Sequence, residues 1–563
     1  MHASLQPFRF TAAGSFGWLL PALVWLLAAP AGPVRAQTQT LALRQLTGHV
    51  PAAVKFLPSG GRLAAARRLH LALGLPLRNT ASLSNLLERI YDPGSPEYRH
   101  YLTPEQFTEQ FGPLPADYER ISRFAREQGL TVAPPRASRL ILDLEGIVAT
   151  VEAALHVTLR TYQHPTEDRV FYAPDAEPTL PADLAVVEIA GLSDWALLRS
   201  GAHGRPLDQT SGIAAGSGPG GSNLGADFRR AYAPRVTLDG AGELVGLIEF
   251  DGYYANDILT YETLAGLPHV PLINVPVDGF TGPPGVANNE VALDIEMAIS
   301  MAPGLAGVVV FEAPNSVANW LDLLDTMASS NQVRQFSSSW GFSGGTGPNA
   351  TFDSVFQRMA AQGQSFFQAS GDGDAWVNPI QTPSGSAYVT SVGGTSLALG
   401  ATDGSYRGET VWNSGNLGAS SAWGPNGNGY WGSGGGFTTA YAIPVWQQGI
   451  SMTLNQGSGA WRNIPDVAMA SDSIWVTYGN GQSGSFFGTS CAAPLWAGFC
   501  ALVNQQAAAN HRAPVGFINP ALYAVATSTN YANCFHDILV GNNTSGVSPS
   551  RYYAVPGFDL CTG

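Results

Sequence analysis

The spacing of apolar and polar positions divides the chain into two parts with different rhythms. In the first part, residues 37–200, short amphipathic helices alternate with strands, and each helix has its own start or stop signal. One such signal is Thr103, an N-cap followed by proline at the first helical position. Helices are expected at 82–91, from 104 onward, at 115–128 and at 147–156, and strands at 139–144, 157–162 and 169–172, the last two paired across a turn. This pattern predicts a small α+β domain.

Beyond residue 223, continuous apolar runs typical of buried strands alternate with helical patterns. Strands are expected at 244–250, 306–311, 333–339 and 365–369, and helices at 290–301, 318–328 and 354–362. Repeated strand and helix units predict an α/β fold with a parallel sheet covered by helices on both faces. Ligands of such sheets bind at the carboxyl ends of the strands.

Two segments are set apart from these domains. Residues 201–223 are rich in Gly, Ser and Pro, which predicts a flexible linker that is open to proteolysis. Residues 1–36 combine Arg9, an apolar run and Val34-Arg35-Ala36, as in a secretory signal peptide. A membrane anchor is the alternative, but Pro21 interrupts the run and no later stretch approaches about 18 apolar residues. We therefore expect a secreted protein without a membrane segment after signal removal.

Charge is distributed unevenly along the chain. The formal net charge is -14, and from Asp227 onward there are nine Arg, no Lys and 23 Asp and Glu residues. Such a surface repels nucleic acid, so a nucleic-acid partner is not expected. In acid the carboxylates are neutralised and few cations remain to repel one another, which suits acidic surroundings.

Four cysteines in an exported protein allow three pairings. Cys491 and Cys500 lie nine residues apart, about 13 Å along one predicted helix, which is too far for a bridge. The sequence therefore favours a disulfide between Cys534 and Cys561.

A candidate nucleophile is Ser490 in the stretch Gly488-Thr489-Ser490, where an apolar segment gives way to small, helix-compatible residues. At such a junction the N–H groups of a helix N-terminus point toward the serine, and small neighbours let a substrate backbone approach. The alternative is a serine or threonine N-cap of a buried helix.

Candidate acids and bases lie on predicted helices and strands. Glu290 and Asp294 are one turn apart on one helix face, which suggests either a solvated acidic stripe or a carboxyl pair that shares a proton. Asp372 follows a buried strand between two glycines, and Glu249 lies inside an apolar run. A carboxyl at Glu249 is expected to be protonated or hydrogen-bonded.

In this order, the motifs of the chain resemble those of the sedolisins, the serine-carboxyl peptidases. The resemblance covers nearly all of residues 37–563. The motifs are Tyr98-Arg99-His100-Tyr101-Leu102-Thr103-Pro104-Glu105-Gln106-Phe107, Glu290-x-x-x-Asp294, Ser339-Trp340-Gly341, Gly371-Asp372, Thr382-Pro383, Tyr388-Val389-Thr390-Ser391-Val392-Gly393-Gly394-Thr395, Asn463-Ile464-Pro465-Asp466-Val467-Ala468, Gly488-Thr489-Ser490, Phe535-His536-Asp537-Ile538 and Pro556-Gly557-Phe558-Asp559.

The resemblance implies a subtilisin-like catalytic domain at 224–563, behind an inhibitory pro-domain of ferredoxin-like topology at 37–200. It implies an acid peptidase, either an endopeptidase or a tripeptidyl-peptidase, that is made as a self-processing zymogen cut within 201–223. Its partners would be protein or peptide substrates and its own pro-domain, and the enzyme would be a monomer. An exported calcium-binding protein without activity on the same fold is the alternative.

The resemblance also assigns roles to residues. Ser490 would be the nucleophile, Glu290 the general base, Asp294 the residue that orients the base, and Asp372 the oxyanion donor. Glu249 and Trp340 would form an outer hydrogen-bond chain. One structural Ca²⁺ would be bound by the side chains of Asp537 and Asp559 and by the carbonyls of Ile538, Val555 and Gly557.

Three positions depart from the family pattern. Phe487 stands where Ser or Gly is usual and is expected to narrow the pocket beside the nucleophile; Val555 replaces a usual Gly; and the sequence stops at Gly563, short of the usual tail. A Ser-His-Asp hydrolase is the competing mechanism, but none of the three histidines beyond residue 223 has a subtilisin-like setting. Because the base must be ionised and Asp372 protonated, reference pKa values near 4 predict activity at about pH 3 to 5.

Overall fold

The computed structural model describes residues 42–563 apart from 202, 206–215, 343–348, 377–382, 402 and 419–428. The expected signal peptide and part of the expected linker therefore lie outside the described residues. Within the described ranges, no helix is both long and apolar enough to cross a membrane.

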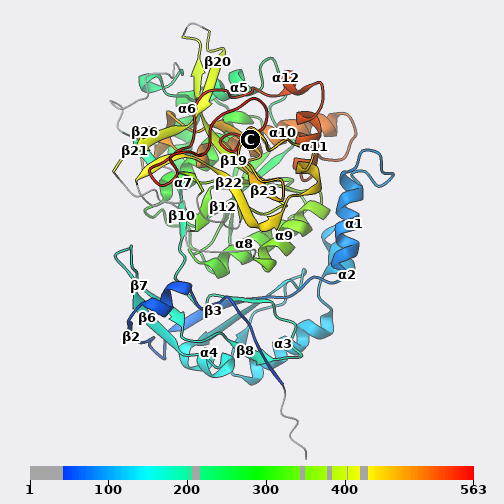
Figure 1. Ribbon diagram of the computed structural model, residues 1–563, viewed down its shortest axis with the longest axis vertical. Coiled ribbons are helices and arrows are strands. Elements are labelled where there is room, and N and C mark those ends of the chain that lie inside the picture. Colours follow the sequence, from blue (N-terminus) through cyan, green and yellow to red (C-terminus); the bar gives the residue numbers. More distant parts are fainter. Residues whose placement is uncertain are drawn as a thin grey trace, which may run out of the picture. The chain divides into compact units, whose positions relative to one another are not determined.

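The C-terminal part, from residue 216 onward, is organised around one eight-stranded sheet (Figure 1). Its neighbouring strands run in the order β13-β14-β12-β15-β17-β19-β20, and β24 pairs with β19. All pairs are parallel except β19 with β20. The strands are β12 (Leu244–Glu249), β13 (Leu272–Pro276), β14 (Gly307–Glu312), β15 (Gln335–Ser338), β17 (Ser365–Ala369), β19 (Thr390–Leu399), β20 (Tyr406–Val411) and β24 (Val467–Ala470).

Helices cover both faces of this sheet, as the sequence predicts. Alternate residues of β12 point to opposite faces, so that Leu247 joins one hydrophobic cluster and Ile248 the other. The first cluster contains α7 (Asn288–Met301) and α10 (Thr489–Ala509); the second contains α8 (Val317–Ser329) and α9 (Ala350–Ala361). The remaining helices of this part are α5 (Ala226–Tyr232), α6 (Ala255–Ala265), α11 (Asn519–Ala526) and α12 (Tyr531–Cys534).

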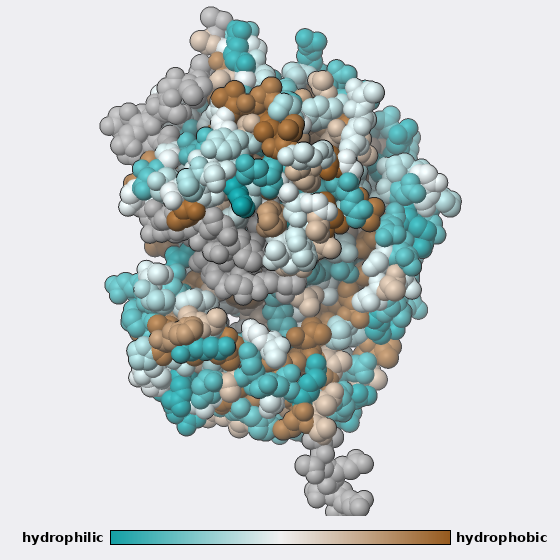
Figure 2. Space-filling view, viewed as in Figure 1, coloured by the Kyte–Doolittle hydropathy of each residue, from teal (hydrophilic) through white to brown (hydrophobic). Residues whose placement is uncertain are grey.

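Most large apolar side chains are used in these cores. On the face shown in Figure 2, hydrophilic residues predominate and apolar residues gather in small separate areas. The exposed apolar residues come from dispersed positions, such as Phe56, Val286 and Leu454.

The N-terminal part contains the predicted α+β domain. Its four-stranded antiparallel sheet has the order β4-β5-β3-β9, with helices between β3 and β4 and between β5 and β9. This is the βαββαβ arrangement of ferredoxin-like folds. The strands are β3 (Arg68–Gly74), β4 (Thr131–Val132), β5 (Ile141–Ile147) and β9 (Glu188–Ala190), and the helices are α1 (Thr80–Tyr91), α2 (Pro104–Phe111), α3 (Pro115–Glu127) and α4 (Val148–Leu155).

Local signals placed these elements well, but pairing between strands far apart in the sequence was not foreseen. Thr103 caps α2 as predicted: its hydroxyl accepts from the backbone N–H of Gln106, whose side chain accepts from the backbone N–H of Thr103. The predicted hairpin of β6 (Leu159–Gln163) and β7 (Val170–Pro174) forms, but it joins β2 (Ser59–Arg62) in a separate three-stranded sheet. Periodicity identifies strands but not their distant partners.

The N-terminal part packs on the face of the C-terminal part that α8 and α9 cover. Apolar residues of α1, α2 and β5, among them Leu83, Phe107 and Ile141, share one hydrophobic cluster with Trp320 and Phe352. The side chain of Tyr91 on α1 also donates a hydrogen bond to the carbonyl of Ala360 on α9 at 2.7 Å.

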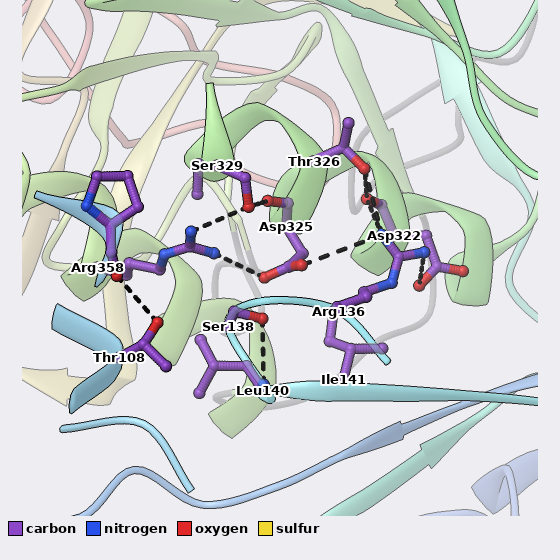
Figure 3. A network of polar contacts seen from close by, with 12 residues as sticks. Thr108, Arg136, Ser138, Leu140, Ile141, Asp322, Asp325, Thr326, Ser329 and Arg358 are labelled. Carbon is purple, nitrogen blue, oxygen red and sulfur yellow. Dashed lines mark hydrogen bonds and ion pairs between the residues drawn. The ribbon is translucent and has the colours of Figure 1, made fainter. Parts of the chain in front are cut away.

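A network of charged groups lies beside this apolar contact (Figure 3). Arg136 of the N-terminal part contacts Asp143 at 2.8 Å and reaches across to Asp322 on α8 at 3.0 Å. Nε2 of His70 on β3 lies 3.4 Å from the other oxygen of Asp322. Asp278 from the segment after β13 and Asp325 on α8 complete the group; Asp325 lies 4.0 Å from Arg136 and 2.8 Å from Arg358, so that four carboxyls share two arginines and one histidine.

Burial and the neighbouring carboxyls together favour the protonated form of Asp322. Burial raises the pKa of Asp322 well above its usual range, the charge of Asp143 raises it further, and Arg136 opposes both. A raised pKa means that the assembled structure favours the protonated form. The contribution of Asp322 to assembly is therefore fully present in acid and is lost as the pH rises through its raised pKa.

We predict that Asp322→Asn, which is permanently neutral, changes the pH dependence of thermal stability. Both proteins carry Ser490→Ala. As the pH rises from about 5 to about 8, the melting temperature of the protein with Asp322 should fall relative to that of the protein with Asp322→Asn. Thr326→Val removes an uncharged contact to Arg136 at 3.2 Å and serves as the control with a constant difference. A wild-type interface that gains stability relative to Asp322→Asn over this range would contradict the prediction.

Candidate active site

Ser490 lies where a strand turns sharply into the long helix of the C-terminal core. Strand β26 (Gln482–Phe487) is followed by Gly488, which has a φ of 145°, and α10 begins at Thr489. Few residues other than glycine adopt this φ, so Gly488 permits the turn. Ser490 is fully buried in the first turn, and its hydroxyl makes no hydrogen bond to the described residues. Since Gly488 is the N-cap, Ser490 does not cap the helix.

Glu290 and Asp294 are not a solvated acidic stripe, because both are fully buried on α7. The hydroxyl of Ser339 donates to Asp294 at 2.7 Å and also lies 3.2 Å from the backbone carbonyl of Ser490. Burial raises the pKa of Asp294 well above its usual range, and the charges of Glu249 and Glu290 raise it further. These effects favour the protonated form of Asp294.

Trp340 and Glu249, the two residues expected to form an outer chain, are hydrogen-bonded to each other. Glu249, the last residue of β12, is fully buried and accepts a hydrogen bond from the indole N–H of Trp340 at 2.8 Å. It also shares a hydrogen bond with Asp294. Burial raises the pKa of Glu249 well above its usual range. The contacts run from Trp340 through Glu249 to Asp294, whose pKa responds to the charge of Glu290.

Asp372 follows β17 and faces the start of α10. One carboxyl oxygen accepts hydrogen bonds from the backbone N–H and the hydroxyl of Thr489, at 2.7 and 2.8 Å. The other oxygen has no hydrogen bond to the described residues. Burial raises the pKa of Asp372 to about 8, the bonds from Thr489 lower it, and the charge of Glu290 raises it.

The beginning of the expected linker crosses this site. Strand β10 (Leu198–Ser200) pairs antiparallel with β16 (Trp340–Phe342), and β11 (His203–Arg205) pairs antiparallel with β26. Gly201 between them is buried and residues 203–205 are paired in a strand, so this end of the linker is not the unstructured join that the sequence suggested. Ladder hydrogen bonds on both sides explain the difference, because composition does not reveal pairing with a distant edge.

Gly201 lies close to the side chains of both Ser490 and Asp372. A β-carbon on residue 201 would lie 2.4 Å from the free oxygen of Asp372 and 2.8 Å from the hydroxyl oxygen of Ser490. A β-carbon on Gly488 would lie 3.0 Å from the carbonyl oxygen of Gly201. A peptide group at this position therefore lies against both side chains. Sequence reasoning missed Gly201 because a Gly/Ser/Pro segment hides its position.

The expected calcium residues come from two segments near the C-terminus, residues 537–538 and 555–559, which contact each other. The backbone N–H of Gly557 lies 3.1 and 3.3 Å from the two carboxyl oxygens of Asp537, and the backbone N–H of Val555 lies 3.2 Å from Asp559. Asp559 and Ile538 are buried, whereas Asp537 is exposed. Two carboxylates that already face the same loop of backbone groups offer the hard oxygen ligands that Ca²⁺ prefers. The residues fit such a site.

The predicted disulfide between Cys534 and Cys561 is wrong, because all four cysteines are unpaired. Cys561 is buried in a small cluster with Tyr552 and Leu560, whereas Cys534 is exposed at the end of α12. Elimination of one pairing by helix geometry therefore did not establish the other.

The histidines beyond residue 223 do not form a charge relay. His269 pairs with Glu262 at 2.9 Å, and His536 packs against Tyr406 with ring centroids 3.7 Å apart. His511 follows α10 at its far end. Carboxyls, not imidazoles, therefore lie beside Ser490 in the described structure.

Comparisons with known proteins agree with this arrangement. Residues 58–194 match the family described as "Pro-kumamolisin, activation domain", and residues 301–521 match the "Subtilase family". Kumamolisin of Bacillus sp. (strain MN-32) is 30% identical over 548 residues, which cover 92% of this chain and 93% of that protein. Sedolisin of Pseudomonas sp. (strain 101) is 27% identical, with 95% and 91% covered, and tripeptidyl-peptidase 1 of Rattus norvegicus is 27% identical, with 90% and 92% covered.

The fold also matches a solved structure, Pseudomonas sedolisin (serine-carboxyl proteinase) complexed with two molecules of pseudo-iodotyrostatin. The TM-score is 0.50 at 24% identity, and the match covers 60% of this chain and 94% of the other. With an activation domain ahead of a subtilisin-like sheet and near full-length similarity to kumamolisin, the chain belongs to the sedolisin family of serine-carboxyl peptidases.

Proposed function

We propose that this protein is a secreted peptidase that acts in acid and matures by cutting its own linker. The observation that carries the proposal is the position of Gly201, held by strands on both sides against Ser490 and Asp372. Export is supported by the signal-like features of residues 1–36. Removal of the N-terminal part, which would act as the inhibitor, would then open the cleft to other proteins or peptides.

In this mechanism the hydroxyl oxygen of Ser490 attacks the carbonyl carbon of the scissile peptide. Glu290 accepts the hydroxyl proton, and Asp372 donates a hydrogen bond to the oxygen on which negative charge develops. Glu290 then passes the proton to the leaving amine, and a water molecule repeats the sequence to release the acyl group. Asp294, held by Ser339 and Glu249, orients Glu290 and is a positioning residue.

This mechanism predicts the site of self-cleavage. Acidification of the precursor to about pH 4 should cut the bond after Gly201, because Gly201 lies against Ser490 and Asp372 with its carbonyl oxygen toward Gly488, and N-terminal sequencing of the product should begin at Ala202. Ser490→Ala should remain intact, whereas Ser300→Ala, a buried serine that hydrogen-bonds Tyr261, should mature normally. Maturation of purified Ser490→Ala at the wild-type rate would show that another protease cuts the linker.

The second prediction concerns the pH profile. Asp372 donates only while protonated, and its raised pKa keeps the donor form below about pH 8 in the covered site and loses it as the pH rises. Opening the cleft solvates Asp372, so kcat/KM for added peptides should decline at a lower pH than cleavage of the linker.

Asp372→Asn separates charge from hydrogen bonding, because an amide donates at any pH. This variant should be slower at its optimum but should lose less of its rate as the pH rises, and Asp372→Ala should lose about a hundredfold to a thousandfold in kcat. The measurement is kcat/KM against pH for the three proteins. Wild-type rates for Asp372→Ala at about pH 4 would exclude Asp372 as the oxyanion donor.

We also propose one structural Ca²⁺ held by the side chains of Asp537 and Asp559 and by the carbonyls of Ile538, Val555 and Gly557. The ion would neutralise two carboxylates that face one loop and would fix that loop. Chelation should lower the melting temperature, and Asp537→Asn should lower it to the same level without a further effect of chelator. Asp403→Asn, an exposed change elsewhere, is the control. Absence of both a shift and bound metal by elemental analysis would reject the site.

A further inference from the structure

A cluster of three aromatic side chains lies beside the nucleophile. Phe487, three residues before Ser490, packs against Trp412 and Trp431 with ring centroids 5.7 and 5.6 Å apart. All three side chains are at most 1% exposed. The tryptophans come from distant parts of the chain: Trp412 follows β20, and Trp431 lies on β22 (Tyr430–Ala442).

The linker places a planar ring on this cluster. The imidazole of His203 lies 4.8 Å from the ring of Trp431 and 5.4 Å from that of Phe487, between centroids. The backbone fixes this contact, because His203 is directly opposite Phe487 in the antiparallel pair of β11 and β26. His203 itself is exposed, and its imidazole lies between the buried aromatic cluster and the solvent.

The position of His203 relative to the reacting bond can be derived from Gly201. If the carbonyl of Gly201 is attacked, the scissile bond joins residues 201 and 202, and His203 is the second residue after it. This end of the linker must leave the cleft before another peptide can enter. The rings of Phe487 and Trp431 then face the second side chain after the scissile bond of any substrate bound in the same register.

We propose that Phe487 and Trp431 form a specificity subsite that selects a planar ring, aromatic or imidazole, two residues after the scissile bond. The inference rests on the proposed peptidase function and adds a substrate class to it. Trp412 packs behind Phe487 and is a positioning residue.

Ring geometry explains why a planar group is favoured over an aliphatic one. Aromatic rings attract each other at centroid distances of about 4.5 to 7 Å in tilted or edge arrangements, beyond the apolar area that they bury. The interplanar angles of His203 with Trp431 and Phe487 are 34° and 50°, within such arrangements. A histidine in a substrate is protonated at acidic pH and gains a cation–π attraction to the tryptophan face.

The test uses the mature wild-type enzyme and the linker sequence itself, as the peptides Leu-Arg-Ser-Gly-Ala-X-Gly-Arg with Phe, His, Leu or Ala at X. Mass spectrometry locates the cut, and kcat/KM is measured for each peptide. Phe and His should exceed Leu and Ala by about threefold to tenfold. Leu controls for apolar size without a planar ring.

A pair of neighbouring variants assigns the preference to the subsite. Phe487→Leu should reduce the ratio of the Phe to the Leu peptide toward one. Phe486→Leu, an equally conservative change on the other face of β26 where Phe486 packs on Tyr478 at 5.1 Å, should keep the ratio.

The outcomes separate this inference from the function on which it rests. Equal cleavage of all four peptides by the wild-type enzyme would overturn the subsite and leave the peptidase intact, and this result needs no variant. No cleavage of any peptide, together with no self-cleavage, would overturn the proposed function. An unchanged ratio in folded Phe487→Leu would also overturn the subsite.

Discussion

The structure depends on burying carboxyl groups beside Ser490 with neutral hydrogen-bond partners. Glu249, Glu290, Asp294 and Asp372 are all fully buried. The donors that the structure supplies to three of them are the indole of Trp340 and the hydroxyls of Ser339 and Thr489, together with one backbone N–H. Neutral donors cannot compensate several negative charges in a medium of low dielectric, so protons must. This requirement couples the fold to acid.

The packing of helices α7 and α10 holds these carboxyls and Ser490 in place. Their apolar faces share one core with the parallel strands, so the carboxyls on α7 and the serine on α10 are fixed by packing and not by loops. Strand β12 ends at Glu249 and β17 ends shortly before Asp372, which places both at the carboxyl edge of the sheet. The packed helices and strands keep the carboxyls close together, although their negative charges would repel one another.

Much of this could be predicted from the sequence, and the limits have physical causes. The buried strand at Glu249, the helix with Glu290 and Asp294 and the junction before Ser490 carry local signals of period and punctuation. The order of the strands and the fate of Gly201 depend on pairing between distant edges, which no local pattern encodes. The cysteine pairing failed for a related reason, since the burial of Cys561 is a tertiary property.

The aromatic cluster shows how one departure changes a site without changing its chemistry. Phe487 looks in the sequence like an obstruction beside the nucleophile. In the structure it is the last residue of β26, opposite His203 of the linker, and its ring packs against Trp431. If Ser490 attacks the carbonyl of Gly201, position 487 would act on the leaving side of the substrate, while the carboxyls would act on the reacting bond itself.

The linker pairs with the edges of two different strands, and this would affect when the cleft becomes free after the cut. Strand β10 is held by β16 and β11 by β26, so a cut at Gly201 leaves each new end bound to its own edge. The N-terminal part also keeps its apolar contact with α8 and α9. Cutting then turns a tethered ligand of very high effective concentration into a separate molecule whose occupancy depends on total protein concentration. Dilution, and not the cut alone, would set when the cleft becomes free.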